Sequence, residues 1–212
     1  LKDMAIRPII EVPDKRLKTV SQDIAAVTDE TRQLMDDMLE TMYAAEGIGL
    51  AAIQVGVAER VIVMDLSQRD RSEDADLEGD AGDPNGTDVN DGSDAVIDAQ
   101  ACDTQIAETG PRYFVNPKII WSSDETRNYQ EGCLSVPGFY DDVERPAQCR
   151  IAYLDYDGEP QELACDGLLA TCIQHEIDHL NGIVFLDHLS RLKRQIVLKK
   201  ITKAERDTAR AE

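Results

Sequence analysis

The sequence has few aromatic residues (5%), few basic residues and no long apolar run. A membrane-spanning helix needs roughly 18 uninterrupted apolar residues, so none is predicted. The 22 basic residues face 42 acidic ones, which gives a formal net charge of -20 and disfavours non-specific binding to nucleic acid or an anionic membrane surface. The first 25 residues hold scattered charges and no apolar run, so no secretory signal is visible.

Cysteine is also sparse. Five cysteines are an odd number and do not resemble a disulfide framework. A reducing, cytoplasmic location fits better, because cysteine is then free to bind a metal. The length of 212 residues suits one domain with a core large enough to fold unaided.

The acidic residues are concentrated in residues 67–110. This segment is rich in Asp, Gly, Asn and Ser, and its few apolar residues show no sustained period. Such a composition buries too little surface to offset the entropy of ordering, so we expect a flexible insertion within the domain 1–212. Calcium binding over 83–92 is a weak alternative, because the glycines and acidic residues lack the EF-hand spacing.

Outside the insertion, apolar periodicity predicts both helices and strands. Helical patterns cover 28–46, with Thr28 or Asp29 as the N-cap, then 167–179 and 190–209. Short β-rich runs lie between them, at 60–64, 113–115, 119–121, 149–153 and 162–165. Helices at both ends and antiparallel hairpins between them predict an α+β domain.

The strongest local signal is His175-Glu176-Ile177-Asp178-His179, an H-E-x-x-H sequence on a predicted helix. Residues four apart lie about 40° from each other around a helix, so both imidazoles can reach one ion. Because the flanking residues are apolar, the helix should be buried, where unpaired rings and a carboxylate would be costly. The alternative is a pair of surface histidines. We predict a metal site at the centre of the fold, which needs a third ligand and a position open to water.

Two upstream tracts are weak when taken singly. Cys133 lies in Glu-Gly-Cys-Leu-Ser-Val-Pro-Gly (131–138) and would by itself more often be a small buried residue than a ligand. Gln54 lies in Gly-Ile-Gly-Leu-Ala-Ala-Ile-Gln-Val-Gly (47–56) and could be an ordinary polar residue of a strand. Downstream, His188 falls outside the spacing of the H-x-x-G-x-x-H extension found in one group of zinc proteases.

Together these tracts are specific. GIGLAAIQVG, EGCLS and QHEIDHL, in this order and at these separations, closely resemble the peptide deformylase family. PDKRL at 13–17, RYFVNP at 112–117 and the stretch 182–189 are similar to the same family. The resemblance covers most of the chain apart from the acidic insertion. It implies a metal-dependent hydrolase that removes the formyl group from N-formylmethionyl nascent peptides and releases formate.

The resemblance also implies a metal centre. In it, Cys133, His175 and His179 bind one divalent ion, which in this family is usually Fe(II). Ni(II), Co(II) and Zn(II) are alternatives, because one thiolate and two imidazoles suit several borderline metals. Ferrous iron with a thiolate ligand would make the site sensitive to oxygen.

Catalytic roles follow from the same resemblance. Glu176 accepts a proton from the activated water and delivers it to the departing amine. The backbone N–H of Leu134 and the side-chain amide of Gln54 stabilise negative charge on the formyl oxygen. Ile53 stands where deformylases commonly have proline, which removes a constraint on φ next to Gln54.

A methionine side chain needs an apolar slot beside the metal. Helix geometry places three candidates of the last-but-one helix on or near the His175 face. Two more come from the glycine-rich tract, and one of them, Gly49, resembles a family position whose backbone binds the substrate. For the side chains, plain core packing is the alternative. These candidates are Leu168, Thr171, Cys172, Ile48 and Gly49. Glu131 and Arg145 occupy positions that resemble an ion pair able to fix the Cys133 loop.

The last predicted helix is basic, with eight Lys and Arg against three acidic residues over 189–212. A solvated helix face is the default explanation, and docking on the ribosome is the hypothesis that fits an enzyme acting on nascent chains. Two other functions compete with the deformylase prediction. A zinc endopeptidase would leave Cys133 unexplained, and a non-catalytic metal-binding homologue would not require Glu176 or Gln54.

Overall fold

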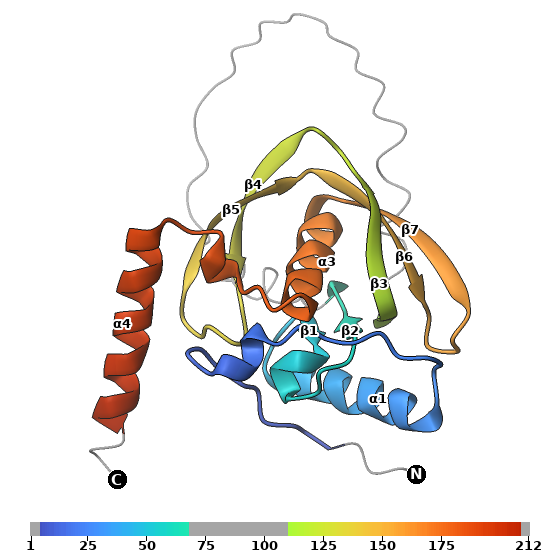
Figure 1. Cartoon of the computed structure of the whole chain (residues 1–212), viewed down its shortest axis with the longest axis horizontal. Helices are drawn as coiled ribbons and strands as arrows, with labels where there is room; N and C mark the ends of the chain where they lie inside the picture. The colour runs from blue at the N-terminus through green and yellow to red at the C-terminus, as the bar shows by residue number, and fades with distance from the viewer. Residues whose placement is uncertain (1–4, 68–109, 209–212) are drawn as a thin grey trace, which may run out of the picture.

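The computed structural model describes residues 5–67 and 110–208. Apart from its two end residues, the acidic insertion expected over 67–110 lies outside these ranges, as does the calcium alternative at 83–92. The described chain has the predicted α+β architecture, in which strands curve around one central helix (Figure 1).

Five strands form an antiparallel sheet in the order β1-β2-β3-β6-β7. Their bounds are β1 Gly49–Ala51, β2 Val61–Met64, β3 Arg112–Ser122, β6 Gln148–Leu154 and β7 Pro160–Asp166. The predicted strands at 60–64, 149–153 and 162–165 correspond to β2, β6 and β7. The Asp157-Gly158 turn joins β6 to β7, and Gly158 has the positive φ of 89° that such a turn favours.

The two short strands predicted at 113–115 and 119–121 are one strand, β3. Its pairing with β6 shifts register between Val115 and Lys118 and again between Ile119 and Trp121. Asn116 lies at the first irregularity with a φ of 52°, and its side chain bonds both the N–H and the carbonyl of Ile24. The irregular backbone breaks the alternation of apolar residues, which is why the sequence pattern divides the strand.

A second, two-stranded sheet was missed by sequence analysis. It pairs β4, Thr126–Gly132, with β5, Tyr140–Pro146. Most side chains of β4 are exposed on both faces, so no alternation of apolar and polar residues marks it. This sheet carries Glu131 and leads directly into Cys133.

The central helix is α3, Gly167–Leu180, and α1, Asp29–Ala44, packs on the opposite side of β2. Ile62 and Met64 of β2 belong to the core shared with α3, whereas Val61 and Val63 belong to the core shared with α1. Alternate residues of a strand point to opposite faces, so the uniformly apolar β2 is buried on both. Thr28 is the N-cap of α1 and completes a capping box with Thr31.

The C-terminal helix is α4, Arg191–Thr208, which matches the predicted 190–209 within two residues. It follows a short 3-10 helix, η3, Phe185–Asp187, and lies at one side of the molecule (Figure 1). Two other 3-10 helices are η1, Lys15–Lys18, and η2, Ala52–Val55. In the described ranges, no helix combines the length and apolar character that crossing a bilayer requires.

Candidate active site and metal centre

Cys133, His175 and His179 converge on one point, although they come from different elements. Cys133 directly follows β4, and both histidines lie one turn apart on α3. One ligand atom from each lies within 4.8 Å of the others, and the Cys133 Sγ is 3.1 Å from His179 Nε2. Both histidines are buried. The predicted helix geometry and the predicted third residue therefore meet at a site that can hold a metal ion.

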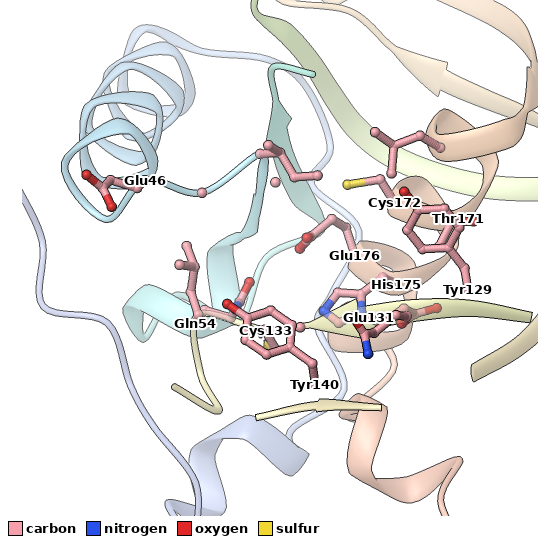
Figure 2. Close-up of a pocket in the computed structure, with 17 residues that line it drawn as sticks. Glu46, Gln54, Tyr129, Glu131, Cys133, Tyr140, Thr171, Cys172, His175 and Glu176 are labelled. Atoms are coloured by element: carbon pink, nitrogen blue, oxygen red, sulfur yellow. Dashed lines mark hydrogen bonds and ion pairs between the residues drawn. The ribbon is translucent and has the colours of Figure 1, made fainter. Parts of the chain in front are cut away.

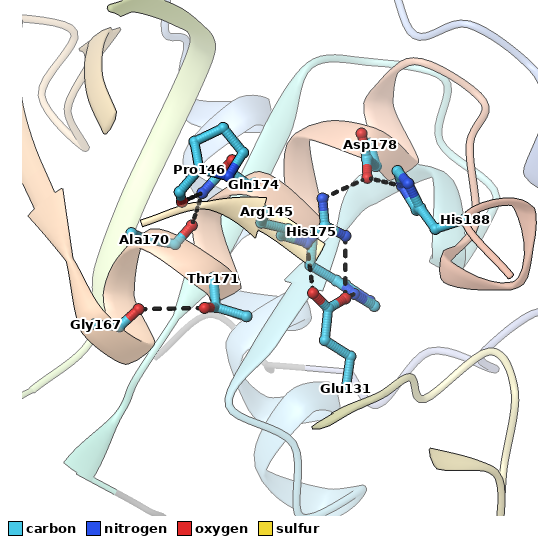
Figure 3. A network of polar contacts seen from close by, with 10 residues as sticks. All are labelled: Glu131, Arg145, Pro146, Gly167, Ala170, Thr171, Gln174, His175, Asp178 and His188. Carbon is cyan, nitrogen blue, oxygen red and sulfur yellow. Dashed lines mark hydrogen bonds and ion pairs between the residues drawn. The ribbon is translucent and has the colours of Figure 1, made fainter. Parts of the chain in front are cut away.

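Glu131 orients one of these rings. The Nδ1 of His175 lies 2.8 Å from the Glu131 carboxylate, which leaves Nε2 as the nitrogen available to an ion (Figure 3). The ion pair expected between Glu131 and Arg145 is present and buried, with two hydrogen bonds from the guanidinium to the carboxylate. Burial alone would raise the pKa of Glu131, but the bonds from His175 and Arg145 hold it below its usual range. The pair thus fixes His175 as well as the strand that leads into Cys133.

Glu176 lies beside the three ligand candidates and is almost fully buried. Its Oε2 makes no hydrogen bond to the described residues. Desolvation raises the pKa of the Glu176 carboxyl to about 7. A β carbon placed on Gly49 would come within 2.6 Å of Glu176 Oε1, so the carboxylate lies directly against the β1 backbone. A carboxyl group in this state can both accept and donate a proton near neutral pH.

Gln54 is held by two hydrogen bonds. Its Oε1 accepts from the Ala51 N–H at 2.8 Å, and its Nε2 donates to the Ser135 hydroxyl at 3.1 Å. The same Nε2 lies 3.7 Å from Cys133 Sγ, which aims the amide at the ligand cluster. Ile53, the residue that departs from the family pattern, is buried in the core next to α3. The side-chain bonds therefore hold the Gln54 amide without a proline before it.

A cavity of about 310 Å³ opens onto this cluster (Figure 2). Every residue expected to contact substrate lies on its wall, namely Ile48, Gly49, Leu168, Thr171 and Cys172. Gln54, Leu134, Cys133, His175 and Glu176 line it as well. The cavity therefore brings the proposed slot, the proposed proton carrier and two ligand candidates to one surface.

Sequence analysis missed part of this wall. Tyr129, Gln130 and Tyr140 line the cavity from the two-stranded sheet, and Glu46 and Gly47 line it from the end of α1. The strands were not expected, so no pattern pointed to their side chains. Asp178 lies within the H-E-x-x-H sequence, which predicts no function for this position. It binds Arg145 at 2.8 Å and His188 at 2.7 Å.

His188 was the only histidine downstream of the motif and therefore the one available for an endopeptidase-type site. It contacts Asp178 and is not part of the ligand cluster found among the described residues, where Cys133 takes the third place. The helix, the Cys133, His175 and His179 ligand set and the neighbouring carboxylate define a metal-dependent hydrolase.

Comparison with known proteins agrees. Residues 6–195 match the family model for polypeptide deformylase. The peptide deformylase of Phenylobacterium zucineum is 52% identical over 200 residues, which cover 94% of this chain and 97% of that protein. That of Maricaulis maris is 50% identical over 207 residues, 98% of each chain. A crystal structure of peptide deformylase from Ehrlichia chaffeensis in complex with actinonin is 40% identical, with a TM-score of 0.75, covering 96% of this chain and 99% of that one. This chain belongs to the polypeptide deformylase family.

Proposed function

We propose that this protein removes the formyl group from N-formylmethionyl nascent polypeptides and releases formate. The observation that carries the proposal is the convergence of the half-buried Cys133 with the buried His175 and His179. Cys133 and His175 line one cavity together with the neighbouring Glu176. Family membership supports the same reaction.

The residues of the cluster fit a divalent metal ion. His175 already uses Nδ1 to bind Glu131, so its Nε2 is left for the ion. One thiolate and two imidazoles suit Fe(II), and also Ni(II), Co(II) or Zn(II). We propose Fe(II) as the ion used in the cell, held by Cys133, His175 and His179. When bound there, it acidifies a water molecule and polarises a carbonyl oxygen.

Glu176 is the proposed proton carrier. Because burial raises its pKa to about 7, its ionised and protonated forms are both populated near neutrality. It can accept a proton from the attacking water and later deliver that proton to the departing amine nitrogen. Its place against Gly49 sets the carboxylate between the ligand cluster and the strand where a peptide would lie.

Gln54 and Leu134 are proposed to stabilise the charge that develops on the formyl oxygen. The Gln54 amide is fixed before substrate arrives, so no free energy is lost to reorienting it during the reaction. Leu134 directly follows Cys133 and lines the cavity, so its N–H lies beside the ligand cluster. The methionine side chain is proposed to occupy the slot walled by Ile48, Leu168 and Cys172.

Formate release from formyl-Met-Ala-Ser under anaerobic conditions tests the proposal. The Fe(II)-loaded protein is expected to release formate, and Glu176→Gln is expected to lose activity while it retains the metal. An active Glu176→Gln protein would remove the proton-transfer role. Cleavage of internal peptide bonds, with metal retained in Cys133→Ala, would favour the endopeptidase. Metal binding without either reaction would favour the non-catalytic homologue.

Inhibitor binding gives a readout independent of turnover. Actinonin is bound in the Ehrlichia chaffeensis structure, and we propose that it occupies the corresponding cavity here. Actinonin should raise the melting temperature of the metal-loaded protein and should do so much less for Cys133→Ala.

We also propose that the basic helix α4 docks on the ribosome. Lys193 and Arg194 pair with Asp141 and Asp187 of this protein. Arg191, Lys199 and Lys203 are exposed and form no ion pair among the described residues. Replacing the three exposed residues with glutamate should weaken ribosome co-sedimentation at low salt and leave formate release from the tripeptide unchanged. Unchanged co-sedimentation would refute the docking.

A reducing, cytoplasmic location and a single domain over 1–212, with 67–110 as an insertion, complete the proposal. Four cysteines of the described residues are free thiols, which suits a reducing compartment. The family match runs from residue 6 to residue 195, across the insertion.

A further inference from the structure

His188 is the one histidine that the proposed function leaves without a role. It ends η3, just before α4, and its side chain is about one-third exposed. Its Nε2 lies 2.7 Å from Oδ2 of Asp178. Because a carboxylate oxygen only accepts hydrogen bonds, Nε2 must carry the hydrogen of this pair.

This contact is the outer end of a continuous chain of bonds. The same Oδ2 of Asp178 accepts from Nη1 of Arg145 at 2.8 Å. Arg145 donates through Nε and Nη2 to Glu131, and Glu131 accepts from Nδ1 of His175 at 2.8 Å. Figure 3 shows these links joined from His188 to His175. Donors and acceptors alternate along the chain, so each bond orients the next group.

The chain places one buried cation between two carboxylates. The Arg145 side chain is 7% exposed, that of Glu131 3% and that of Asp178 18%. The planar guanidinium has fixed donor directions, so a rotation of Asp178 tilts the plane that holds Glu131. Asp178 is the most exposed member of the three, and His188 is its partner on the outer side. Loss of His188 would therefore allow the Asp178 carboxylate, the most exposed of the three groups, to rotate.

We infer that His188 is a positioning residue for the metal centre, and that it couples the junction between η3 and α4 to the orientation of His175. The inference rests on the proposed function, because His175 must bind a metal for its orientation to matter. The coupling needs only the hydrogen-bonding N–H of His188 and no change in its charge.

Affinity for Co²⁺, measured by competition with a chelator under anaerobic conditions, tests this with the whole chain. His188→Phe keeps a flat ring but removes the N–H, whereas His188→Gln places an amide N–H at a similar reach. Asp187→Asn is the matched control, because Asp187 lies on η3 and pairs with Lys18 and Arg194 but does not contact Arg145. The absorption spectrum of bound Co²⁺ reports the ligand geometry directly.

Direct partners of metal-binding histidines typically contribute 10–100-fold to affinity. Because His188 acts on His175 through Asp178, Arg145 and Glu131, we expect His188→Phe to weaken Co²⁺ binding by about three- to tenfold and to alter the spectrum. His188→Gln should restore both to within about twofold, and Asp187→Asn should lower the melting temperature without changing either.

Two results would overturn the inference. Either His188→Phe binds Co²⁺ as wild type does, or Asp187→Asn weakens binding equally, which would mean that general loosening of η3 is responsible. Failure of the metal centre itself gives a different result, in which Cys133→Ala binds Co²⁺ as tightly as the unaltered protein.

Discussion

His175 and Glu131 are 44 residues apart in the chain, yet Nδ1 of the ring lies 2.8 Å from Oε2 of the carboxylate deep in the protein. The contact joins α3 to Glu131, the next-to-last residue of β4, which is followed by Gly132 and Cys133. It sets the ring so that the other nitrogen faces the ligand cluster. The geometry of the proposed metal centre therefore depends on a carboxylate that does not belong to the cluster.

Glu131→Gln tests that dependence. The amide keeps the shape of the side chain and one acceptor oxygen. It removes the negative charge that pairs with Arg145 and that makes the His175 ring more basic. We expect metal affinity to fall about tenfold, at the lower end of the usual range for such partners. Chelator competition measures it, and Glu144→Gln, on the exposed side of the neighbouring strand β5, is the control. Equal affinities for all three proteins would contradict the orienting role.

Gly49→Ala tests the close approach of Glu176 to β1. The added methyl carbon would lie 2.6 Å from Glu176 Oε1 and 3.2 Å from Cys172 Sγ, so the carboxylate has to move. We expect kcat for formyl-Met-Ala-Ser to fall by about 10²-fold or more, since general acid–base catalysis contributes 10²–10⁴-fold. Metal content should stay constant, because Gly49 is not part of the ligand cluster. A variant with normal kcat would show that the carboxylate has room to act elsewhere.

Apolar periodicity was enough to predict the elements with a buried face. The helices α1 and α3 and the strand β2 each bury a stripe or both faces, so their patterns are strong. The strand β4 exposes most of its side chains, so no apolar pattern marks it. In β5 burial alternates, but the inward positions are Asp141, Val143 and Arg145, so charged residues hide the alternation. The contribution of these two strands to the cavity wall, including Tyr129 and Tyr140, could therefore not be seen.

The site residues also divide into those that local sequence spacing predicts and those that depend on tertiary structure. Helical spacing alone placed His175 and His179 on one side of α3, because that relation is local. Cys133 joined them only through the family resemblance, since no local spacing relates a residue 46 positions from His179 to it. The bonds of Asp178 to Arg145 and to His188 depend on how β5 and η3 pack against α3. That tertiary relation is predicted neither by helical spacing nor by the family resemblance.

Ser135→Ala tests how the Gln54 amide is held. Ser135 is completely buried and its hydroxyl accepts the Gln54 Nε2–H at 3.1 Å. Without this hydroxyl, the Gln54 amide keeps only the hydrogen bond from the Ala51 N–H and can rotate about it. We expect kcat to fall about tenfold with KM within about twofold, less than the 10²–10³-fold that loss of an oxyanion donor costs. Ser123→Ala is the control, because this half-buried hydroxyl donates to the Glu125 carbonyl and accepts from the Gln148 N–H but does not line the cavity. Parallel changes in kcat, KM and metal content would indicate a structural role instead.

Asp37→Asn tests a pH-dependent contribution to stability far from the active site. Burial would raise the pKa of the Asp37 carboxyl, but hydrogen bonds from the Ala5 N–H, the Gln33 amide and the Arg7 guanidinium outweigh it and hold the pKa below its ordinary value. Because the folded pKa is the lower one, the ionised carboxylate stabilises the folded state at every pH above the unfolded value of about 3.9. That stabilisation disappears as the pH falls through the folded pKa. Asp37→Asn should therefore cost about 1–3 kcal/mol in the free energy of unfolding at pH 7.

The pH profile separates this charge effect from a loss of packing. The difference between wild type and Asp37→Asn should be constant from pH 7 to about 5. It should shrink below about pH 4, where the carboxyl of the unfolded chain takes up a proton first, and should be lost below the folded pKa. Urea unfolding at each pH measures it, and taking the difference cancels acid-driven loss of metal, which affects both proteins. Asp124→Asn, at an exposed carboxylate, should stay within about 0.5 kcal/mol of wild type throughout. A cost for Asp37→Asn that persists unchanged at pH 3 would mean that the side chain stabilises α1 and the N-terminal segment through its shape, because a neutral carboxyl would then serve as well as a charged one.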